Sequence, residues 1–141
     1  MVAGVMVLET QGTLLQRRPR LAWLPRRERR ALSQLAVTMD VPAGQSLVRQ
    51  GTPADAFYVI EHGRASVIRD DEHLQHLGGG DFFGELGLLQ GGVRTASVVA
   101  GSDIRVRVIS KSDFGQAMRV LPTLANAVRA RALERLRTLP A

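Results

Sequence analysis

Residues 81–98 have the sequence DFFGELGLLQGGVRTASV, and this stretch decides which fold and function we predict for the chain. A short apolar run carries one carboxylate, Glu85, in its middle, and one guanidinium, Arg94, follows nine residues later. Between the β-favouring runs of the sequence, residues 84–89 alone have the pattern of a helical turn. We therefore ask what an acid and a base do beside one isolated turn of helix.

A single helical turn leaves the backbone N–H groups of its first residues, here Glu85, Leu86 and Gly87, without partners inside the helix. Such a helix start favours an anion, and a phosphate group fits it. Residues 90–93 form a loop that returns the chain, so that the planar guanidinium of Arg94 can bind the same phosphate through two N–H groups.

Glu85 is not suited to bind the phosphate itself, because two anions repel each other. A ribose beside a phosphate, however, carries a hydroxyl group that can donate a hydrogen bond to a carboxylate. Glu85 and Arg94 together therefore describe a ligand with a sugar half and a phosphate half. The alternative is that the two side chains form an ion pair with each other, and the spacing by itself leaves both interpretations open.

The composition is that of one folded, soluble domain. The chain has 141 residues, of which 45% are hydrophobic and 23% charged, and no uncharged stretch is long enough to cross a bilayer. The absence of cysteine excludes disulfides and thiolate metal sites, and the first ten residues lack the features of a signal peptide. We expect a cytoplasmic location, either free or as the cytoplasmic domain of a membrane protein.

The net charge of +6 comes almost entirely from arginine, because Lys111 is the only lysine. Many arginines lie within residues 17–30 and 129–137. This distribution could attract an anionic partner, but the solvated faces of two amphipathic helices would carry the same charges. We favour the solvated helices and expect no nucleic-acid partner.

The centre of the chain, from Val37 to Ser110, consists of short β-favouring runs separated by turn residues. The candidate strands are residues 46–49, 56–61, 64–69, 73–77, 95–99 and 104–109. Their regular spacing predicts a β-sandwich or a small barrel. The strict alternation in the last of them predicts one buried face, with Arg105 and Arg107 facing water.

Helical patterns stand on both sides of this β-rich centre. Two short helices are expected from about Gly12 to Leu35, the second opening near Pro25. After the strands, residues 110–113 form the pattern of a capping box that starts a helix through Met118, and Pro122 opens a final amphipathic helix.

The predicted fold class is therefore α+β, in which an antiparallel, jelly-roll-like β-roll of about eight strands is flanked by helices. N-terminal helices, the short helix within residues 81–98 and two C-terminal helices surround the roll. We expect one domain in all, made of an N-terminal helical segment (1–35), the β-roll (36–110) and the C-terminal helices (111–141).

The central motif resembles the phosphate-binding cassette of the cyclic nucleotide-binding domain family. In that family phenylalanine-glycine-glutamate is followed by a leucine-rich step and then by arginine, a small residue and alanine. Residues 83–86 and 94–98 match this pattern in order and spacing, which places the cassette at residues 82–96. Residues 42–47, 51–60 and 63–67 resemble the strands and turns that precede the cassette in the family.

The resemblance implies a role for each matching residue. Glu85 would accept a hydrogen bond from the ribose 2′-hydroxyl, and Arg94 would bind the cyclic phosphate of cAMP or cGMP. The implied ligand-binding residues of the cassette are Phe83, Gly84, Glu85, Leu86, Gly87, Arg94, Thr95 and Ala96. Thr95 stands where members that prefer cGMP often carry a hydroxyl, although members that respond to cAMP carry it too. Gly87 and Val93 depart mildly from the alanine and proline common in the family, and we expect them to loosen the turn.

The last helix resembles the lid of the ion-channel members, in which an arginine at the position of Arg135 stacks on the base or bonds to it. The implied function is a cyclic nucleotide sensor that moves this lid to control an attached or partner effector, such as a channel or transporter. The alternative is an interaction domain of the same fold that binds no ligand and holds an acidic partner with its arginine-rich helices. We expect no other cofactor, and the sequence does not predict the oligomeric state.

Other functions are less well supported. A metal-dependent β-barrel enzyme would need converging histidines, but His73 and His76 are three residues apart on one candidate strand and should point to opposite faces. No side chain stands in a recognisable nucleophile setting, so we expect no catalysis. Only two residues follow Leu139, so we expect a sensor domain without the DNA-recognition helix of related transcription factors.

Overall fold

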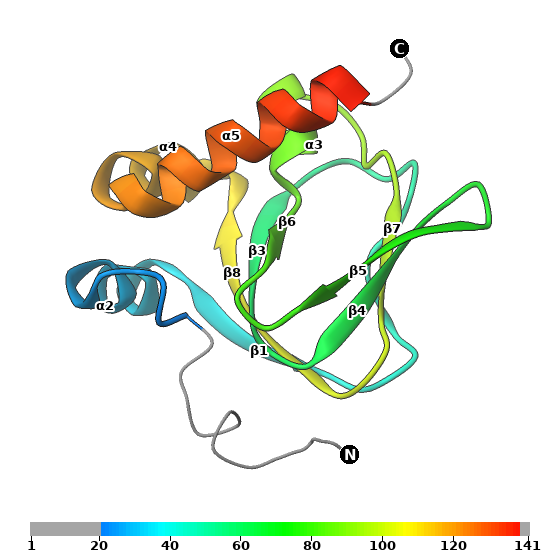
Figure 1. The fold of residues 1–141 in the computed structure, drawn as a ribbon, viewed down its shortest axis with the longest axis horizontal. Coiled ribbons are helices and arrows are strands. Elements are labelled where there is room, and N and C mark those ends of the chain that lie inside the picture. The colour runs from blue at the N-terminus through cyan, green and yellow to red at the C-terminus, as the bar shows by residue number, and fades with distance from the viewer. Residues whose placement is uncertain (1–20, 139–141) are drawn as a thin grey trace.

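The computed structural model describes residues 21–138 of the protein, with side chains described as far as Glu134. Two four-stranded antiparallel sheets face each other and form a β-roll (Figure 1). The first sheet has the order β1-β8-β3-β6, made of β1 (Val37–Val41), β8 (Ile104–Ser110), β3 (Ala56–His62) and β6 (Phe82–Phe83). The second has the order β2-β7-β4-β5, made of β2 (Ser46–Val48), β7 (Ser97–Ala100), β4 (Arg64–Arg69) and β5 (Glu72–Gly78).

Within residues 21–138, four helices accompany the sheets: α2 (Arg26–Leu35), α3 (Glu85–Gln90), α4 (Lys111–Val120) and α5 (Pro122–Thr138). In Figure 1, α2 and α4 lie on the same side of the β-roll, and α5 runs from that side across the roll and passes α3. The predicted α+β class, with an antiparallel β-roll and flanking helices, is thus confirmed. The first of the two predicted N-terminal helices begins at about Gly12, and most of its range lies outside the described part of the chain; the described residues 21–24 form a turn before α2.

Strand β3 lies at the centre of the fold because both of its faces are apolar. Phe57 and Val59 pack on the helices together with Leu32 and Leu124, whereas Tyr58 and the other inward residues point into the β-roll. The five residues from Ala56 to Ile60 are all buried. A continuous apolar run of this kind is what a strand covered on both sides requires.

Several local predictions are confirmed to within a few residues. The side chain of Ser110 accepts a hydrogen bond from the amide of Asp113 at 3.3 Å and so caps α4, as the capping-box pattern predicts. The candidate strand list lacked β1 and β6. Strand β1 lies at the edge of its sheet with four of its five residues exposed, and β6 has only two residues, so neither carries a clear apolar pattern.

The prediction for the two histidines of β5 was wrong. The rings of His73 and His76 lie 4.3 Å apart between centroids and therefore share one face. The cause is a β-bulge, because Val67 pairs with Gln75 while the next residue of β4 pairs with His73, which leaves Leu74 as an extra residue. Within the described residues, no three side chains of the types that bind metals are grouped so that they could hold an ion.

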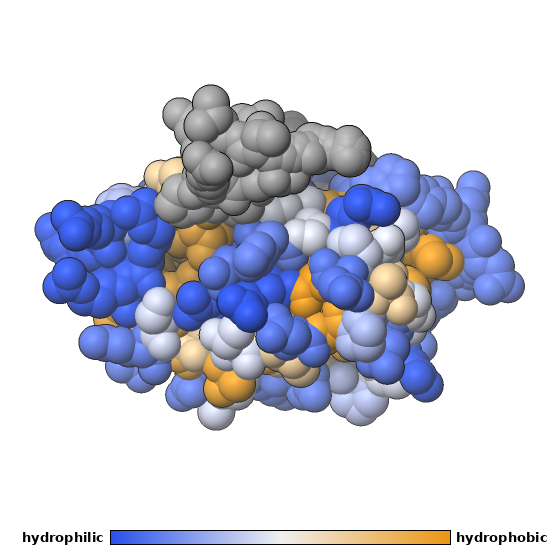
Figure 2. Space-filling view, turned by 90° about the horizontal axis from the view of Figure 1, so that it is seen from below, coloured by the Kyte–Doolittle hydropathy of each residue, from blue (hydrophilic) through white to orange (hydrophobic). Residues whose placement is uncertain are grey.

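On the face of the molecule that Figure 2 shows, apolar residues form separate patches among polar ones. Arg105 faces solvent as predicted and binds the carboxylate of Asp40 at 2.7 Å, and this bond holds the pKa of Asp40 below its usual value. Arg107 is only partly exposed and pairs with Glu61 at 2.8 Å. None of the helices within residues 21–138 combines the length and apolar composition needed to cross a membrane.

Candidate functional site

The cassette begins where β6 ends and α3 starts. Gly84, the residue before the helix, has a left-handed backbone with φ of 97°, which side chains rarely tolerate. A Cβ atom at this position would lie 2.9 Å from Nη1 of Arg94 and 3.0 Å from the carbonyl oxygen of Ala56. Glycine is therefore required here both by the turn and by the arginine packed against it.

Arg94 is almost fully buried, with 4% of its surface exposed. Its Nη1 donates to the carbonyl of Gly84 at 3.0 Å, and its Nη2 donates to the carbonyl of Ala56 at 2.6 Å. The guanidinium also lies 5.8 Å from the ring centroid of Tyr58. These contacts hold the side chain in one place before any ligand arrives, which reduces the entropy lost on binding.

The loop between β2 and β3 fixes the backbone of Arg94. Its amide donates to the carbonyl of Thr52 at 2.8 Å, and its carbonyl accepts from the amide of Gly51 at 2.9 Å. Two residues before Arg94, the carbonyl of Gly92 accepts a hydrogen bond from the amide of Ala54 at 3.1 Å. The loop between β2 and β3 therefore sets the position of the arginine as firmly as the cassette does.

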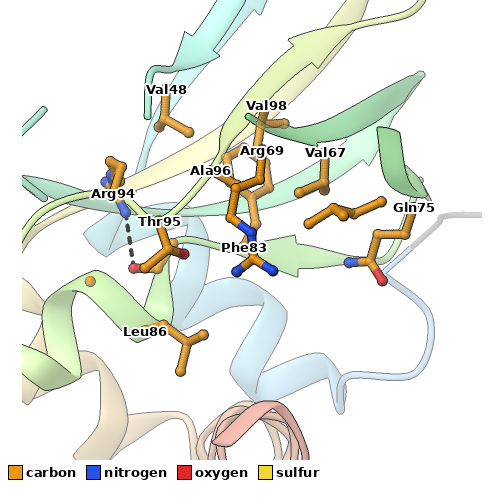
Figure 3. Close-up of a pocket in the computed structure, with 13 residues that line it drawn as sticks. Val48, Val67, Arg69, Gln75, Phe83, Leu86, Arg94, Thr95, Ala96 and Val98 are labelled. Atoms are coloured by element: carbon orange, nitrogen blue, oxygen red, sulfur yellow. Dashed lines mark hydrogen bonds between the residues drawn. The ribbon is translucent and has the colours of Figure 1, made fainter. Parts of the chain in front are cut away.

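The guanidinium lines a cavity of about 240 Å³ between the cassette and the second sheet (Figure 3). Apolar side chains from β2, β4, β5, β6, α3 and β7 form much of its wall: Val48, Val67, Leu74, Phe83, Leu86 and Val98. The polar side chains at its surface are Arg69, Gln75, Arg94 and Thr95. A mainly apolar hollow with a few converging polar groups is the usual form of a small-molecule site.

Most of the predicted cassette residues meet at this cavity. Those that line it are Phe83, Gly84, Leu86, Gly87, Arg94, Thr95 and Ala96. Glu85 is the first residue of α3 and has no exposed surface. Arg135 belongs to α5, but its side chain lies outside the described part of the structure.

Sequence reasoning missed the wall opposite the cassette, formed by Arg69 of β4 with Leu74 and Gln75 of β5. Alternation within β4 could have placed Arg69 on the same face as Val67. No such signal exists for β5, because the bulge turns both Leu74 and Gln75 towards the cavity.

Arg94 also forms an ion pair with the carboxylate of Asp55, at 3.5 Å. Asp55 is 81% exposed, so this bond is weakened by solvent. The stronger contacts of Arg94 are its hydrogen bonds to neutral backbone carbonyls, which leave its positive charge available to a ligand anion.

Tyr58 supports the site from inside the β-roll. Its ring is stacked on that of Phe83, with centroids 4.8 Å apart and planes 4° from parallel. Burial, with a contribution from the charge of Asp55, raises the pKa of Tyr58 above its ordinary value, and the charge of Arg94 opposes the shift.

The expectation that Gly87 loosens the turn requires a correction. A Cβ atom at this position would lie 2.6 Å from the Cβ atom of Ala54, closer than two such atoms can approach. Gly87 is therefore part of a tight contact between α3 and the loop before β3, because Ala54 leaves no room for a side chain at this position.

Helix α5 reaches the cassette end of the molecule. The guanidinium of Arg131 lies 4.6 Å from the ring centroid of Phe82, the first residue of β6. This distance is within the range of a cation–π contact. The helix that carries the predicted lid is therefore docked against the strand that leads into the cassette.

Comparison with known proteins agrees with this geometry. Residues 38–120 match the family described as the cyclic nucleotide-binding domain. A cAMP-dependent protein kinase regulatory subunit of Hypocrea atroviridis is 36% identical over 100 residues, which are 71% of this chain and 22% of that protein. A cyclic nucleotide-gated potassium channel of Rhizobium etli is 37% identical over 95 residues, which are 67% of this chain and 26% of the channel. The chain thus spans about a quarter of the length of these relatives.

Solved structures give the same result. The catabolite activator protein of Thermus thermophilus superposes with a TM-score of 0.73 at 29% identity, covering 85% of this chain and 59% of that one. The regulatory domain of Toxoplasma gondii PKA, solved with cAMP, superposes with a TM-score of 0.64 at 26% identity, covering 79% of this chain and 45% of that one. The chain belongs to the cyclic nucleotide-binding domain family.

Proposed function

We propose that the cavity binds a purine 3′,5′-cyclic nucleotide, with Arg94 at the cyclic phosphate and Glu85 at the ribose 2′-hydroxyl. The backbone amides of Gly84, Leu86 and Gly87 would assist at the phosphate. Thr95 and Ala96 would border the ligand on one side and Phe83 on the other, since all three line the cavity.

The observation that carries this proposal is a buried guanidinium at the wall of a mostly apolar cavity. Arg94 is 4% exposed and is bonded to two uncharged carbonyls, and the carboxylate of Asp55 with which it pairs at 3.5 Å is 81% exposed. A phosphate diester carries one negative charge and oxygens that match the planar fork of arginine.

We propose cAMP as the first ligand to test, because relatives of the chain include cAMP-dependent kinase regulatory subunits. Thr95, Arg69 and Gln75 keep cGMP as a candidate, since each lines the cavity and offers a donor to a purine. Comparing the two nucleotides at equal concentration distinguishes them.

We propose further that α4 serves as a hinge and α5 as a lid, with Arg135 near the base. Closing of the lid on the nucleotide would pass the signal to an effector attached to this domain or bound to it. The relatives that support this include a channel and kinase regulatory subunits, so the effector belongs to either of these classes. A ligand can shift the lid only if it binds the closed state more tightly than the open one.

Replacing Arg94 tests the phosphate contact. Arg94→Ala should weaken nucleotide binding by about 2 to 4 kcal/mol, because it removes a buried charge-assisted bond. Isothermal titration calorimetry with cAMP and cGMP provides the measurement. Arg94→Lys keeps the positive charge but loses the planar fork of arginine, so its affinity for the nucleotide should lie between those of the wild type and Arg94→Ala.

The matched control is Arg119→Ala, which removes an exposed arginine of α4 that does not line the cavity. It should bind like the wild type. An unchanged dissociation constant in a folded Arg94→Ala variant would place the phosphate elsewhere.

Replacing Glu85 tests the ribose contact. Glu85→Gln should weaken binding of the 2′-hydroxyl nucleotide much more than binding of its 2′-deoxy analogue, because only the former donates to the carboxylate. Competition binding with both ligands gives the two losses directly. Equal losses would exclude the ribose role.

The interaction-domain alternative has its own outcome in these titrations. If neither nucleotide produces heat with the folded wild type at high protein concentration, the domain has the fold of the family but does not bind these nucleotides. The exposed arginines of α2, Arg26, Arg27 and Arg30, would then be the surface to test against an acidic partner.

A further inference from the structure

The start of α5 is a partly buried helix end that its own sequence does not cap. Leu121, which precedes the helix, is fully buried and has no side-chain acceptor. Pro122 has no N–H group, but the amides of Thr123 and Leu124 do, and helix geometry gives them no partner within α5. Buried amides without acceptors would destabilise this end considerably.

Glu28 supplies the missing acceptors from α2, 95 residues earlier in the chain. Both of its carboxylate oxygens accept from the amide of Thr123 at 3.0 Å, and Oε1 also accepts from the amide of Leu124 at 3.3 Å. The side chain is 4% exposed. A carboxylate at a helix N-terminus also interacts favourably with the helix dipole.

The capped end of α5 is also where the helix joins the main core. Leu124 and Val128 of α5 pack with Leu32 of α2 and with residues of α4 and β3. From this base the helix runs towards the cassette, where Arg131 lies against Phe82 (Figure 1). Helix α5 has 17 residues. Its length is therefore about 25 Å, and a tilt of roughly 10° at the base would move its far end by about 4 Å.

We propose that Glu28 is a positioning residue for nucleotide binding. By holding the first amides of α5, it fixes the direction of the helix and keeps its far end docked at the cassette, although Glu28 itself does not line the cavity. The proposal rests on the lid function given to α5 above. It assigns control of nucleotide affinity to a residue outside the binding site.

The first test needs no nucleotide. Because the chain has no cysteine, spin labels can be placed at Arg30→Cys on α2 and Asn126→Cys on α5, two exposed positions. The distance distribution between them should be narrow in the otherwise wild-type protein and should broaden with Glu28→Ala. Ser33→Ala, which removes the contact of α2 with Arg107 at 3.3 Å and leaves α5 untouched, should keep it narrow. A Glu28→Ala distribution as narrow as that of the control would overturn the proposal.

The second test measures affinity by calorimetry. Glu28→Ala should weaken cyclic nucleotide binding about tenfold and should speed dissociation, as expected from losing hydrogen bonds to a charged group. Glu28→Gln keeps one acceptor oxygen and should lose less affinity for the nucleotide than Glu28→Ala does. The ratio of the dissociation constants for the nucleotide and its 2′-deoxy analogue should stay at the wild-type value, because the cavity is unchanged.

Val106→Ala controls for stability, since it removes buried volume from the interior of the β-roll without touching α5. If it weakens binding as much as Glu28→Ala does, the effect is general destabilisation and the proposal is wrong. A wild type that binds neither nucleotide would refute the proposed function, and the spin-label distances would still report whether Glu28 positions α5. Wild-type binding with unaltered affinity in Glu28→Ala would refute only the role given to Glu28.

Discussion

Arg94 illustrates how much of a binding residue's environment comes from residues distant in sequence. Its motif places it after α3, but its guanidinium is held by the carbonyls of Ala56 and Gly84 and lies near the ring of Tyr58. Tyr58 is stacked in turn on Phe83. A ligand anion would therefore meet a cation whose position is already fixed, which favours affinity.

Tyr58 gives a prediction about pH. Burial raises the pKa of Tyr58 above 10.0, so the folded protein holds this proton more tightly than the unfolded chain does. The resulting stability is complete below pH 10.0 and is lost as the pH rises through the folded pKa. Urea unfolding at about pH 9 and about pH 11 should show the loss, and Tyr58→Phe should remove this part of the dependence.

Tyr58 is the only tyrosine in the chain, so the tyrosinate absorbance of the folded protein reports this group alone. Its titration should occur above that of the urea-unfolded protein. Coincident titration curves for the two states would show that the ring is not buried as described.

At the scale of elements, the short helix α3 is held in place by close packing more than by its length. An isolated helix of six residues is not stable in water. The loop before β3 supports α3 through the tight contact between Gly87 and Ala54 and through backbone hydrogen bonds to Gly92 and Arg94. The cassette and this loop therefore form one structural unit.

This packing predicts a compensating pair of substitutions. Gly87→Ala should destabilise the protein by about 1 to 3 kcal/mol, because the new methyl group overlaps Ala54. Ala54→Gly should recover part of this loss when the two changes are combined. Urea denaturation of the two single variants and the double variant gives the coupling energy. Strictly additive losses would mean that the two residues do not contact each other.

The elements also mark the limit of prediction from local pattern. The helix starts at Pro25, Ser110 and Pro122 were predictable because capping and proline geometry act within a few residues. The bulge at Leu74 was not, because it depends on how β5 pairs with β4 and leaves no mark on the sequence of β5 alone. The error about the histidines followed directly from this.

At the scale of the whole molecule, the first sheet joins two cores. One face contributes Phe57 and Ile109 to the core shared with the helices, and the other contributes Tyr58 and Ile60 to the interior of the β-roll beside the cavity. The helices and the interior of the β-roll beside the cavity therefore pack on opposite faces of the same strands. This arrangement is suited to a regulatory domain, in which a binding event must be transmitted.

Docking of α5 gives the prediction at this scale. Arg131→Ala should weaken nucleotide binding severalfold, because it removes the cation–π contact with Phe82 that holds the far part of the helix near the cassette. Calorimetry measures the loss. Arg129→Ala on the exposed face of the same helix is the matched control and should bind like the wild type. Equal affinities of both variants would show that the docked position of α5 does not contribute to binding.

The sequence by itself determined the fold class, the cassette and the order of the elements other than β1 and β6, since these depend on apolar period, turn residues and a compact motif within residues 82–98. The tertiary structure alone decided that Glu28 caps α5, that Tyr58 lies under Arg94 and that β5 turns two side chains into the cavity. For Glu28 and Tyr58 the physical reason is sequence distance, because only the packing of sheets and helices brings these segments together. For β5 the reason is its pairing with β4, which sets the bulge and which the sequence of β5 alone does not record.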